Sequence, residues 1–307
     1  MPQQPYVLRT ILREEFPVTL QNMHRPPASL YIAGELPPPY YKYLCVIGSR
    51  TYSSYGKDSC QNIISGLAGH PICIVSGMAI GIDSIAHEAA LSAGLRTIAF
   101  PGSGLNFDAL YPVNKRNLAL DILNRNGALV SEFEPNQPGG LWTFPNRNRL
   151  MAGISHAILV IEARRGSGTL ITAQYATDFD RDIMAVPGPI SAELSYGPHM
   201  LIRRGAALIT SAEDILHEFN LVEQPQIPLV EKRGSRSRTP RTYSKNIESL
   251  HLSPEERRLC SFLAIESLTS TDLMEKSGLS ITQLNTLMTQ LELSGVVYQE
   301  QGVYGLK

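Results

Sequence analysis

The sequence predicts an α/β fold, with a doubly wound, mostly parallel sheet of the Rossmann type and a small C-terminal winged-helix domain. Between residues 41 and 220, short apolar runs rich in β-branched residues alternate with helical patterns, and glycines follow most of these runs. After a basic, polar segment, helical periodicity returns in residues 251–307. Apolar strands that alternate with amphipathic helices are typical of a parallel sheet covered on both faces.

Residues 1–40 are interpreted as a lead-in, in which the stretch 16–34 ends in a short strand-like run. Six strands are then expected from apolar runs, at LCVIG (44–48), ICIVSG (72–77), TIAF (97–100), ALVS (128–131), AILVIEA (157–163) and IMAVPG (183–188). Helical patterns occupy 54–68, 82–93, 114–126, 146–154, 168–179 and 211–219. Right-handed crossovers between these strands produce a doubly wound sheet, so 41–220 is predicted to form one Rossmann-type domain.

Residues 221–250 lack apolar periodicity, and 232–245 hold six cations and no acid. We interpret 221–250 as a basic, flexible linker that acts as an electrostatic tether for a polyanion. In 251–307, Ser253 and Glu256 fit a capping box, a turn is expected at Gly278, and a hairpin is expected to turn at 301–302. Three helices and a hairpin indicate a winged-helix domain.

Composition excludes several classes of protein. The 307 residues carry a formal net charge of −1, so a nucleic-acid surface must come from local clustering of cations. The four cysteines are scattered without a C-x-x-C pair, which favours free thiols in a reducing cytoplasm over disulfides or zinc. The first ten residues do not resemble a secretory signal, and no apolar run approaches the length of a membrane span. We therefore expect a cytoplasmic protein without a membrane segment, metal site or cofactor.

Glycine-rich corners follow five of the apolar runs: IGSR (47–50), SGMAIGID (76–83), PGSG (101–104), RRGSGT (164–169) and VPG (186–188). In an open parallel sheet these corners share the edge where ligands bind, and the helix that follows offers free N–H groups to an anion. Glycines also serve simply to permit tight turns, but five corners on one edge favour an anion site. The chain has no P-loop and no dinucleotide-binding spacing, and we predict no catalytic residues.

Cations lie beside these corners: Arg50, then Lys115 and Arg116, then Arg147 and Arg149 on either side of Asn148, then Arg164 and Arg165. A single surface arginine is usually only solvated. Here, however, the aromatic side chains of Trp142 and Phe144 lie just before the pair, and an aromatic ring beside a cation is typical of single-strand binding. For one of the two aromatic residues, packing in the core is the competing interpretation.

Several segments in this order resemble the DprA/Smf (DNA-processing protein A) family: VIGSR, IVSGMAIGIDSIAHEAAL, GSGLNFDALYPVN, GALVSEFEP, FPNRNRLMAGIS, GSGTLITA, AVPGPI and GPHMLIRRGAALITSAEDIL. They span about 46–216. The resemblance implies binding of single-stranded DNA, homodimerisation, and loading of the RecA recombinase onto incoming DNA in natural transformation. By the same motifs, the expected DNA-binding residues are Gly48, Ser49, Arg50, Lys115, Phe144, Arg147, Asn148, Arg149, Ser167 and Gly168.

Two alternatives compete with this hypothesis. One is a nucleoside-monophosphate phosphoribohydrolase of the lysine-decarboxylase-like group, which carries P-G-G-x-G-T-x-x-E where this chain reads RRGSGTLIT and places Thr172 at the glutamate position. The other is a transcription factor that reads DNA through its winged helix. The expected recognition helix, 281–293, has no Lys or Arg, and 247–307 carries a net charge of −4, which disfavours attraction to phosphate. We expect this module to contact a protein instead.

Overall fold

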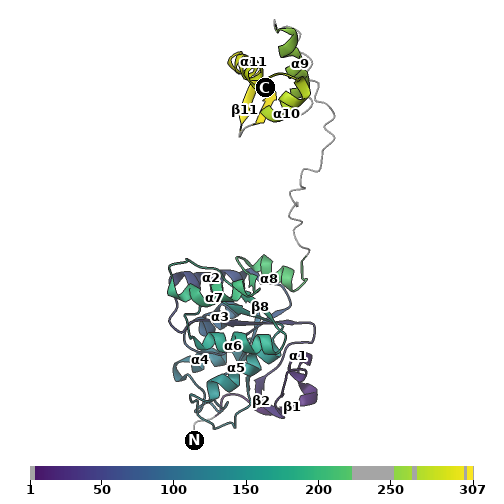
Figure 1. Cartoon of the computed structure of the whole chain (residues 1–307). Helices are drawn as coiled ribbons and strands as arrows, with labels where there is room; N and C mark the ends of the chain where they lie inside the picture. Colours follow the sequence, from purple (N-terminus) through teal and green to yellow (C-terminus); the bar gives the residue numbers. More distant parts are fainter. Residues whose placement is uncertain (1–3, 223–251, 265–267, 301–302, 307) are drawn as a thin grey trace. The chain divides into compact units, whose positions relative to one another are not determined.

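The computed structural model describes residues 4–222, 252–264, 268–300 and 303–306. The chain divides into two compact units, Met1–Pro225 and Gln226–Lys307, each with its own hydrophobic core (Figure 1). The segment interpreted as a basic linker, 221–250, lies outside the described residues except for its first two positions. The expected hairpin turn at 301–302 also lies outside them.

The first unit is built on a nine-stranded sheet with the order β1-β2-β6-β5-β4-β3-β7-β8-β9. The six strands expected from the sequence are all present and pair in parallel with their neighbours among them: β3 (Lys42–Ile47), β4 (Ile72–Ser76), β5 (Arg96–Ala99), β6 (Ala128–Ser131), β7 (Ala157–Val160) and β8 (Asp182–Ala185). A two-residue strand, β9 (Ala207–Leu208), extends the sheet beyond β8. The predicted doubly wound, mostly parallel fold is thereby confirmed.

Residues 1–40, interpreted from the sequence as a lead-in, contribute two strands to this sheet. Strand β2 (Ser29–Gly34) runs antiparallel to β6, and β1 (Arg9–Leu12) pairs antiparallel with β2. Ile11, Leu30 and Ile32 are fully buried in the same core as the parallel strands. Burial of these apolar side chains stabilises the added strands at the edge next to β6.

Helices cover both faces of the sheet (Figure 1). Side chains alternate between the faces along each strand, so each face presents apolar side chains against which helices pack. On β3, Tyr43, Cys45 and Ile47 pack on one face with α1 (Val18–Gln21), α5 (Thr143–Ile154), α6 (Gly168–Asp178) and α7 (Tyr196–Arg203). Leu44 and Val46 pack on the other with α2 (Ser54–Gly66), α3 (Ile82–Ser92) and α8 (Ala212–Glu218). Helix α4 (Arg116–Asn124) closes a smaller cluster. Helices α1 and α7 were not expected from the sequence.

The order of strands places a ligand crevice between β3 and β7. From β3 the chain builds outward through β4, β5 and β6, and it then returns to the other side of β3 for β7, β8 and β9. In open parallel sheets, ligands bind beyond the carboxyl ends of the strands where this direction reverses. The segments that follow β3 and β7, IGSR and RRGSGT, therefore flank the crevice.

The second unit has the elements of the predicted winged helix: α9 (Pro254–Leu263), α10 (Ser270–Ser277), α11 (Ile281–Leu293) and the antiparallel strands β11 (Val297–Glu300) and β12 (Val303–Leu306), with a short β10 (Leu268–Thr269) against β12. The Ser253–Glu256 capping box begins α9, and Gly278 ends α10 in a left-handed conformation. Leu284, Met288 and Leu291 of α11 point into the core, as their helical spacing predicts.

Candidate nucleic-acid interface

A pocket of about 590 Å³ opens at the carboxyl ends of β3 and β7. Its walls come from the segment after β3, the start of α5 and the start of α6. Eight of the ten residues predicted to bind DNA line it, namely Gly48, Ser49, Arg50, Phe144, Arg147, Asn148, Ser167 and Gly168. We call this the crevice pocket. Its location follows from the strand order, because β3 and β7 are neighbours in the sheet and the corners that follow them therefore come together.

The turn that carries Arg50 packs against the residues at the start of α3 and is hydrogen-bonded to them. The Ile82 N–H donates to the Ser49 carbonyl at 3.2 Å, and the Ser49 hydroxyl bonds back to the Thr51 carbonyl at 2.6 Å. Gly81 has φ +100°, and a Cβ there would overlap the Ser49 carbonyl and the Arg50 backbone. A glycine is therefore required for this close approach, and the turn leaves the Arg50 side chain exposed.

Helix α5 begins at Thr143, three residues earlier than the periodicity predicts, and this brings Phe144 into its first turn. The Thr143 hydroxyl donates to the Gly102 carbonyl at 2.6 Å and so ties the helix start to the corner after β5. Phe144 and Arg147 share one helix face because they are three residues apart. The Arg50 guanidinium lies over the Phe144 ring, with 5.4 Å between Cζ and the ring centroid.

Arg147 is buried, with 5% of its surface exposed, and two of its three guanidinium nitrogens donate hydrogen bonds within the protein. Nη1 donates to the carbonyls of Gly77 and Phe100, which directly follow β4 and β5, and Nε donates to Asn148 Oδ1 at 3.0 Å. Within the described residues no hydrogen bond uses Nη2, which leaves it available to a ligand in the pocket. Burial lowers the pKa of Arg147, and the nearby Asp83 carboxylate opposes that shift.

Asp83, which was not among the predicted residues, lines the crevice pocket and interacts electrostatically with Arg147. Burial raises the pKa of its carboxyl group, while the Arg147 guanidinium and the backbone N–H groups of Ala79 and Gly77 lower it. A Cβ on Gly77 would collide with both Arg147 and Asp83. The glycine corner after β4 is therefore shaped to fit between a buried acid and a buried cation.

Ser167 and Gly168 place the start of a helix in the pocket, as their motif predicts. Ser167 is the N-cap of α6, and its hydroxyl accepts from the Thr169 N–H at 3.2 Å. The Thr169 hydroxyl donates to the Gly48 carbonyl at 3.1 Å, which joins the corner after β7 to the corner after β3. The free N–H groups of an 11-residue helix favour a bound anion here.

Lys115 and Arg149 are the two predicted residues that do not line the crevice pocket. Lys115 Nζ pairs with Glu88 Oε1 at 3.0 Å, and Arg149 pairs with Glu132 while also donating to the Arg25 carbonyl. Burial raises the pKa of Glu132, and Arg149 opposes this shift. The sequence offers no sign of these ion pairs, because Glu88 and Glu132 are far in the chain from the cations they pair with, or lie on another element.

The phosphoribohydrolase alternative requires a glutamate in the segment after β7, and this chain has Thr172 at that position. Thr172 is buried in the lining at the position where the phosphoribohydrolase motif has its glutamate. The buried Glu162 instead accepts hydrogen bonds from the N–H and hydroxyl of Ser53 at the start of α2, at 3.0 and 2.5 Å. Within the described residues, no cluster of His, Cys, Asp or Glu could hold a metal ion, and no helix is long and apolar enough to cross a membrane.

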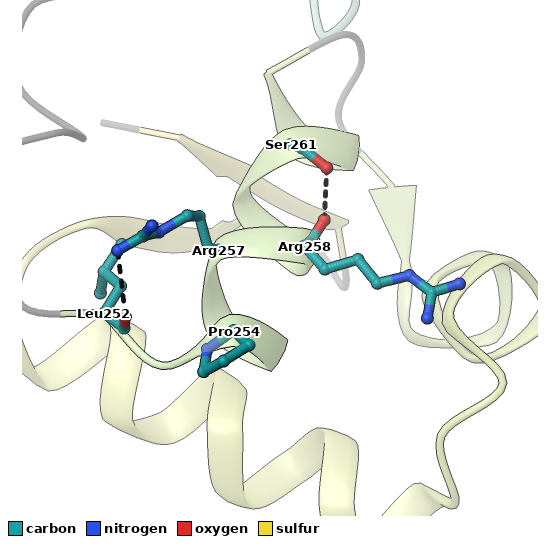
Figure 2. A pocket seen from close by; sticks show the side chains of 5 residues that line it. All are labelled: Leu252, Pro254, Arg257, Arg258 and Ser261. Carbon is teal, nitrogen blue, oxygen red and sulfur yellow. Dashed lines mark hydrogen bonds between the residues drawn. The ribbon is translucent and has the colours of Figure 1, made fainter.

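The C-terminal unit has a hollow of its own, of about 450 Å³, along α9 (Figure 2). Arg257 donates to the Leu252 carbonyl at 3.4 Å, and Arg258 lies over the Phe262 ring at 5.9 Å. Both arginines are exposed, whereas α11 has no Lys or Arg. These two arginines lie on α9, next to Glu255 and Glu256, and Lys276 lies on α10, whereas the helix expected to read DNA has no cation.

Fold and site together define a Rossmann-type protein with a cationic, glycine-lined pocket suited to phosphate groups, joined in sequence to a winged-helix domain. The model of the family described as DNA recombination-mediator protein A matches residues 7–220, and that of the DprA winged helix domain matches 247–302. The chain belongs to the DNA recombination-mediator protein A family, which confirms the resemblance seen in its motifs.

Individual relatives agree with this assignment. Protein Smf of Escherichia coli is 35% identical over 91% of this chain and 71% of the relative, and DNA processing protein DprA of Streptococcus pneumoniae is 40% identical over 68% and 73%. The X-ray structure of DNA processing protein A from Streptococcus pneumoniae superposes with a TM-score of 0.64, at 38% identity, over 70% of this chain and 75% of that one.

A second solved structure is that of DNA processing protein A from Helicobacter pylori, described for its single-stranded DNA binding mode. It superposes with a TM-score of 0.62, at 25% identity, over 71% of this chain and 98% of that one. These relatives support a DNA-processing role and do not favour the phosphoribohydrolase alternative.

Proposed function

We propose that this protein binds single-stranded DNA in the crevice pocket and acts as a recombination mediator that loads RecA onto the strand. One observation carries the proposal most: the exposed Arg50 guanidinium stacks on Phe144 at a pocket that also contains the N-terminus of α6. Cations and helix N–H groups bind phosphates of any sequence, and aromatic rings at the same place favour unpaired bases. The single-stranded DNA binding mode described for the Helicobacter pylori relative supports the same ligand.

The ten predicted residues have different roles in this proposal. Arg50, Asn148, Ser167 and Gly168 contact phosphate directly, Gly48 and Ser49 shape the turn, and Phe144 supports the Arg50 guanidinium. Arg147 offers one amino group to the strand while the rest of its guanidinium holds the sheet edge. Lys115 and Arg149, which form ion pairs outside the pocket, contribute longer-range attraction and contact the DNA only if the strand extends past the pocket.

The test is binding of the full chain to fluorescent dT oligomers and to duplexes of equal length at several salt concentrations. We expect tighter binding to the single strand, little dependence on base sequence, and a log–log salt slope of roughly −0.7 for each phosphate neutralised. Equal affinity for duplex and single strand, or an affinity that does not change with salt, would contradict the proposal.

We further propose that the protein has no catalytic step of its own and acts as a homodimer in the cytoplasm. Four buried free cysteines are consistent with a reducing compartment. Light scattering of the purified chain measures the oligomeric state, and release of adenine from AMP tests for hydrolysis. RecA-dependent ATP hydrolysis on single strands, with and without this protein, tests loading: no stimulation would contradict the mediator role.

The winged-helix domain is proposed to contact a protein partner instead of reading a DNA sequence. The acidic balance of residues 247–307 and the lack of cations on α11 oppose attraction to phosphate. The exposed Arg257 and Arg258 on α9 line the hollow of this unit, where they can pair with acidic groups of a protein partner. Retention of RecA on immobilised protein, compared between wild type and an Arg257→Glu/Arg258→Glu variant, tests whether RecA is that partner.

A further inference from the structure

Phe144, the aromatic residue that the family motif points to, packs against Arg50, Tyr111 and the corner after β5. The Arg50 guanidinium covers it at 5.4 Å, and the Tyr111 ring stands beside it with 5.7 Å between centroids and a tilt of 45°. A Cβ on Gly102 would overlap the edge of the Phe144 ring, so the corner after β5 also packs against it. Phe144 therefore mainly supports Arg50 and shapes the pocket wall.

A second hollow, of about 40 Å³, shares part of its lining with the crevice pocket. It shares Arg50, Ala79, Phe144 and Arg147 with the crevice pocket and adds Gly77, Ile80, Gly102, Tyr111 and Pro112. We call it the aromatic hollow. Tyr111 is 44% exposed and Ile80 is 50% exposed, so both offer apolar surface at its mouth. Its two cations are those it shares with the crevice pocket.

A hydrogen bond fixes the main chain at Tyr111, and the ring packs against Gly139 and Phe144. The Tyr111 N–H donates at 3.0 Å to the hydroxyl of Ser103, a fully buried residue whose carbonyl accepts from the Ser131 hydroxyl at 2.8 Å. Gly139 packs so closely that an added Cβ would stand 3.1–3.2 Å from the Cγ and Cβ of Tyr111. A ring fixed in this way loses little conformational freedom when a ligand stacks on it.

We propose that the mouth of the aromatic hollow is a nucleobase subsite, in which the exposed ring of Tyr111 stacks on one base of a strand whose phosphate lies at Arg50. This inference rests on the proposed function and adds a residue that neither the motifs nor the relatives assign. An exposed aromatic ring beside aliphatic surface suits the flat, apolar face of a base, and it suits a further phosphate poorly because burial next to apolar groups is costly for a charge. Arg50 lines both hollows and so joins base binding to backbone binding.

The experiment is a two-by-two comparison of protein and ligand. Full-length wild type and Tyr111→Ala are titrated with a dT oligomer and with an abasic oligomer of the same length, which keeps every phosphate and lacks every base. We expect Tyr111→Ala to weaken binding of the dT oligomer roughly tenfold, since stacking on an aromatic side chain has about that effect, and to leave binding of the abasic oligomer unchanged. Tyr111→Phe retains the ring and should bind both oligomers like the wild type.

Tyr40→Ala is the matched control, because Tyr40 is also an exposed tyrosine but precedes the amino end of β3, at the opposite end of the strand from Arg50. Thermal unfolding and circular dichroism verify that each variant folds. Unchanged dT affinity in folded Tyr111→Ala, or an equal loss for the abasic oligomer, would overturn the subsite. Failure of the wild type to bind any single strand would instead overturn the proposed function.

Discussion

The guanidinium of Arg50 stacks on the ring of Phe144, 5.4 Å from its centroid, although the two residues lie on different elements. One follows β3 and the other lies in the first turn of α5. Contact between a cation and an aromatic face is worth about 0.5–1 kcal/mol where it is exposed. The contact orients the positive charge of Arg50 at the mouth of the crevice pocket.

Arg50→Ala is expected to weaken binding of single-stranded DNA by about 2 kcal/mol, or roughly thirtyfold in Kd, because one charge-assisted phosphate contact is lost. Lys42→Ala is the matched control: Lys42 begins the same strand, and about 17 Å of strand separate it from Ile47, the last strand residue before the Arg50 turn. Fluorescence anisotropy gives both affinities, and circular dichroism verifies folding. Equal affinities of the two folded variants would show that the strand binds elsewhere.

Gly81→Ala should lower both stability and DNA affinity, because the new Cβ would overlap the Ser49 carbonyl and the Arg50 backbone. Gly69→Ala is the control, since Gly69 also has a positive φ, +81°, but open space around its Cβ position. Both variants carry backbone strain of about 1 kcal/mol or more. The overlap at Gly81 adds a further loss, measured as a lower urea midpoint and a higher Kd. Similar behaviour of the two variants would mean that the Arg50 turn does not depend on Gly81.

Arg147→Ala is expected to destabilise the fold by about 3 kcal/mol, since it leaves the carbonyls of Gly77 and Phe100 without their donor and Asp83 without its counter-charge. Arg149→Ala, which removes a partly exposed ion pair with Glu132, should cost at most about 1 kcal/mol. Urea unfolding of the two variants measures the difference. Equal free energies of unfolding would place Arg147 among the ordinary surface cations.

His87 should make the protein less stable in mild acid. Burial lowers its pKa to about 3, from about 6.5 in the unfolded chain, so it stays neutral in the folded protein. As the pH falls from about 6.5 towards 3, the unfolded state binds a proton that the folded state does not, and stability decreases by up to about 1.4 kcal/mol per pH unit. Unfolding free energies at pH 6 and pH 5 should fall less steeply in His87→Gln. An unchanged slope would show that His87 does not carry this dependence.

The isolated segment 247–307 should bind duplex DNA poorly, because its net charge is −4 and α11 lacks cations. The described part of this unit has its own buried core, which supports independent folding. Selection against a random duplex library at moderate salt provides the test. Recovery of one consensus sequence with submicromolar affinity would favour the transcription-factor alternative.

Much of the fold could be predicted because its signals are local. The runs 44–48, 72–77 and 157–163 are apolar and β-branched, and each became a buried parallel strand. The Ser253 capping box and Gly278 set the ends of winged-helix elements in the same way. The edge strand β1 and helix α7 were missed, since short elements stabilised mainly by tertiary contacts carry little periodicity of their own.

For the site, the sequence by itself determined which residues end the strands at the crevice, because glycines and helix caps mark those corners locally. Only the tertiary structure decided what each side chain does there. It buried Arg147 between two strand ends, paired Arg149 and Lys115 with acids on other elements, and placed Tyr111 beside Phe144. These partners are distant in the chain, and a side chain's exposure and pairing depend on the packing of whole elements, which local patterns do not encode.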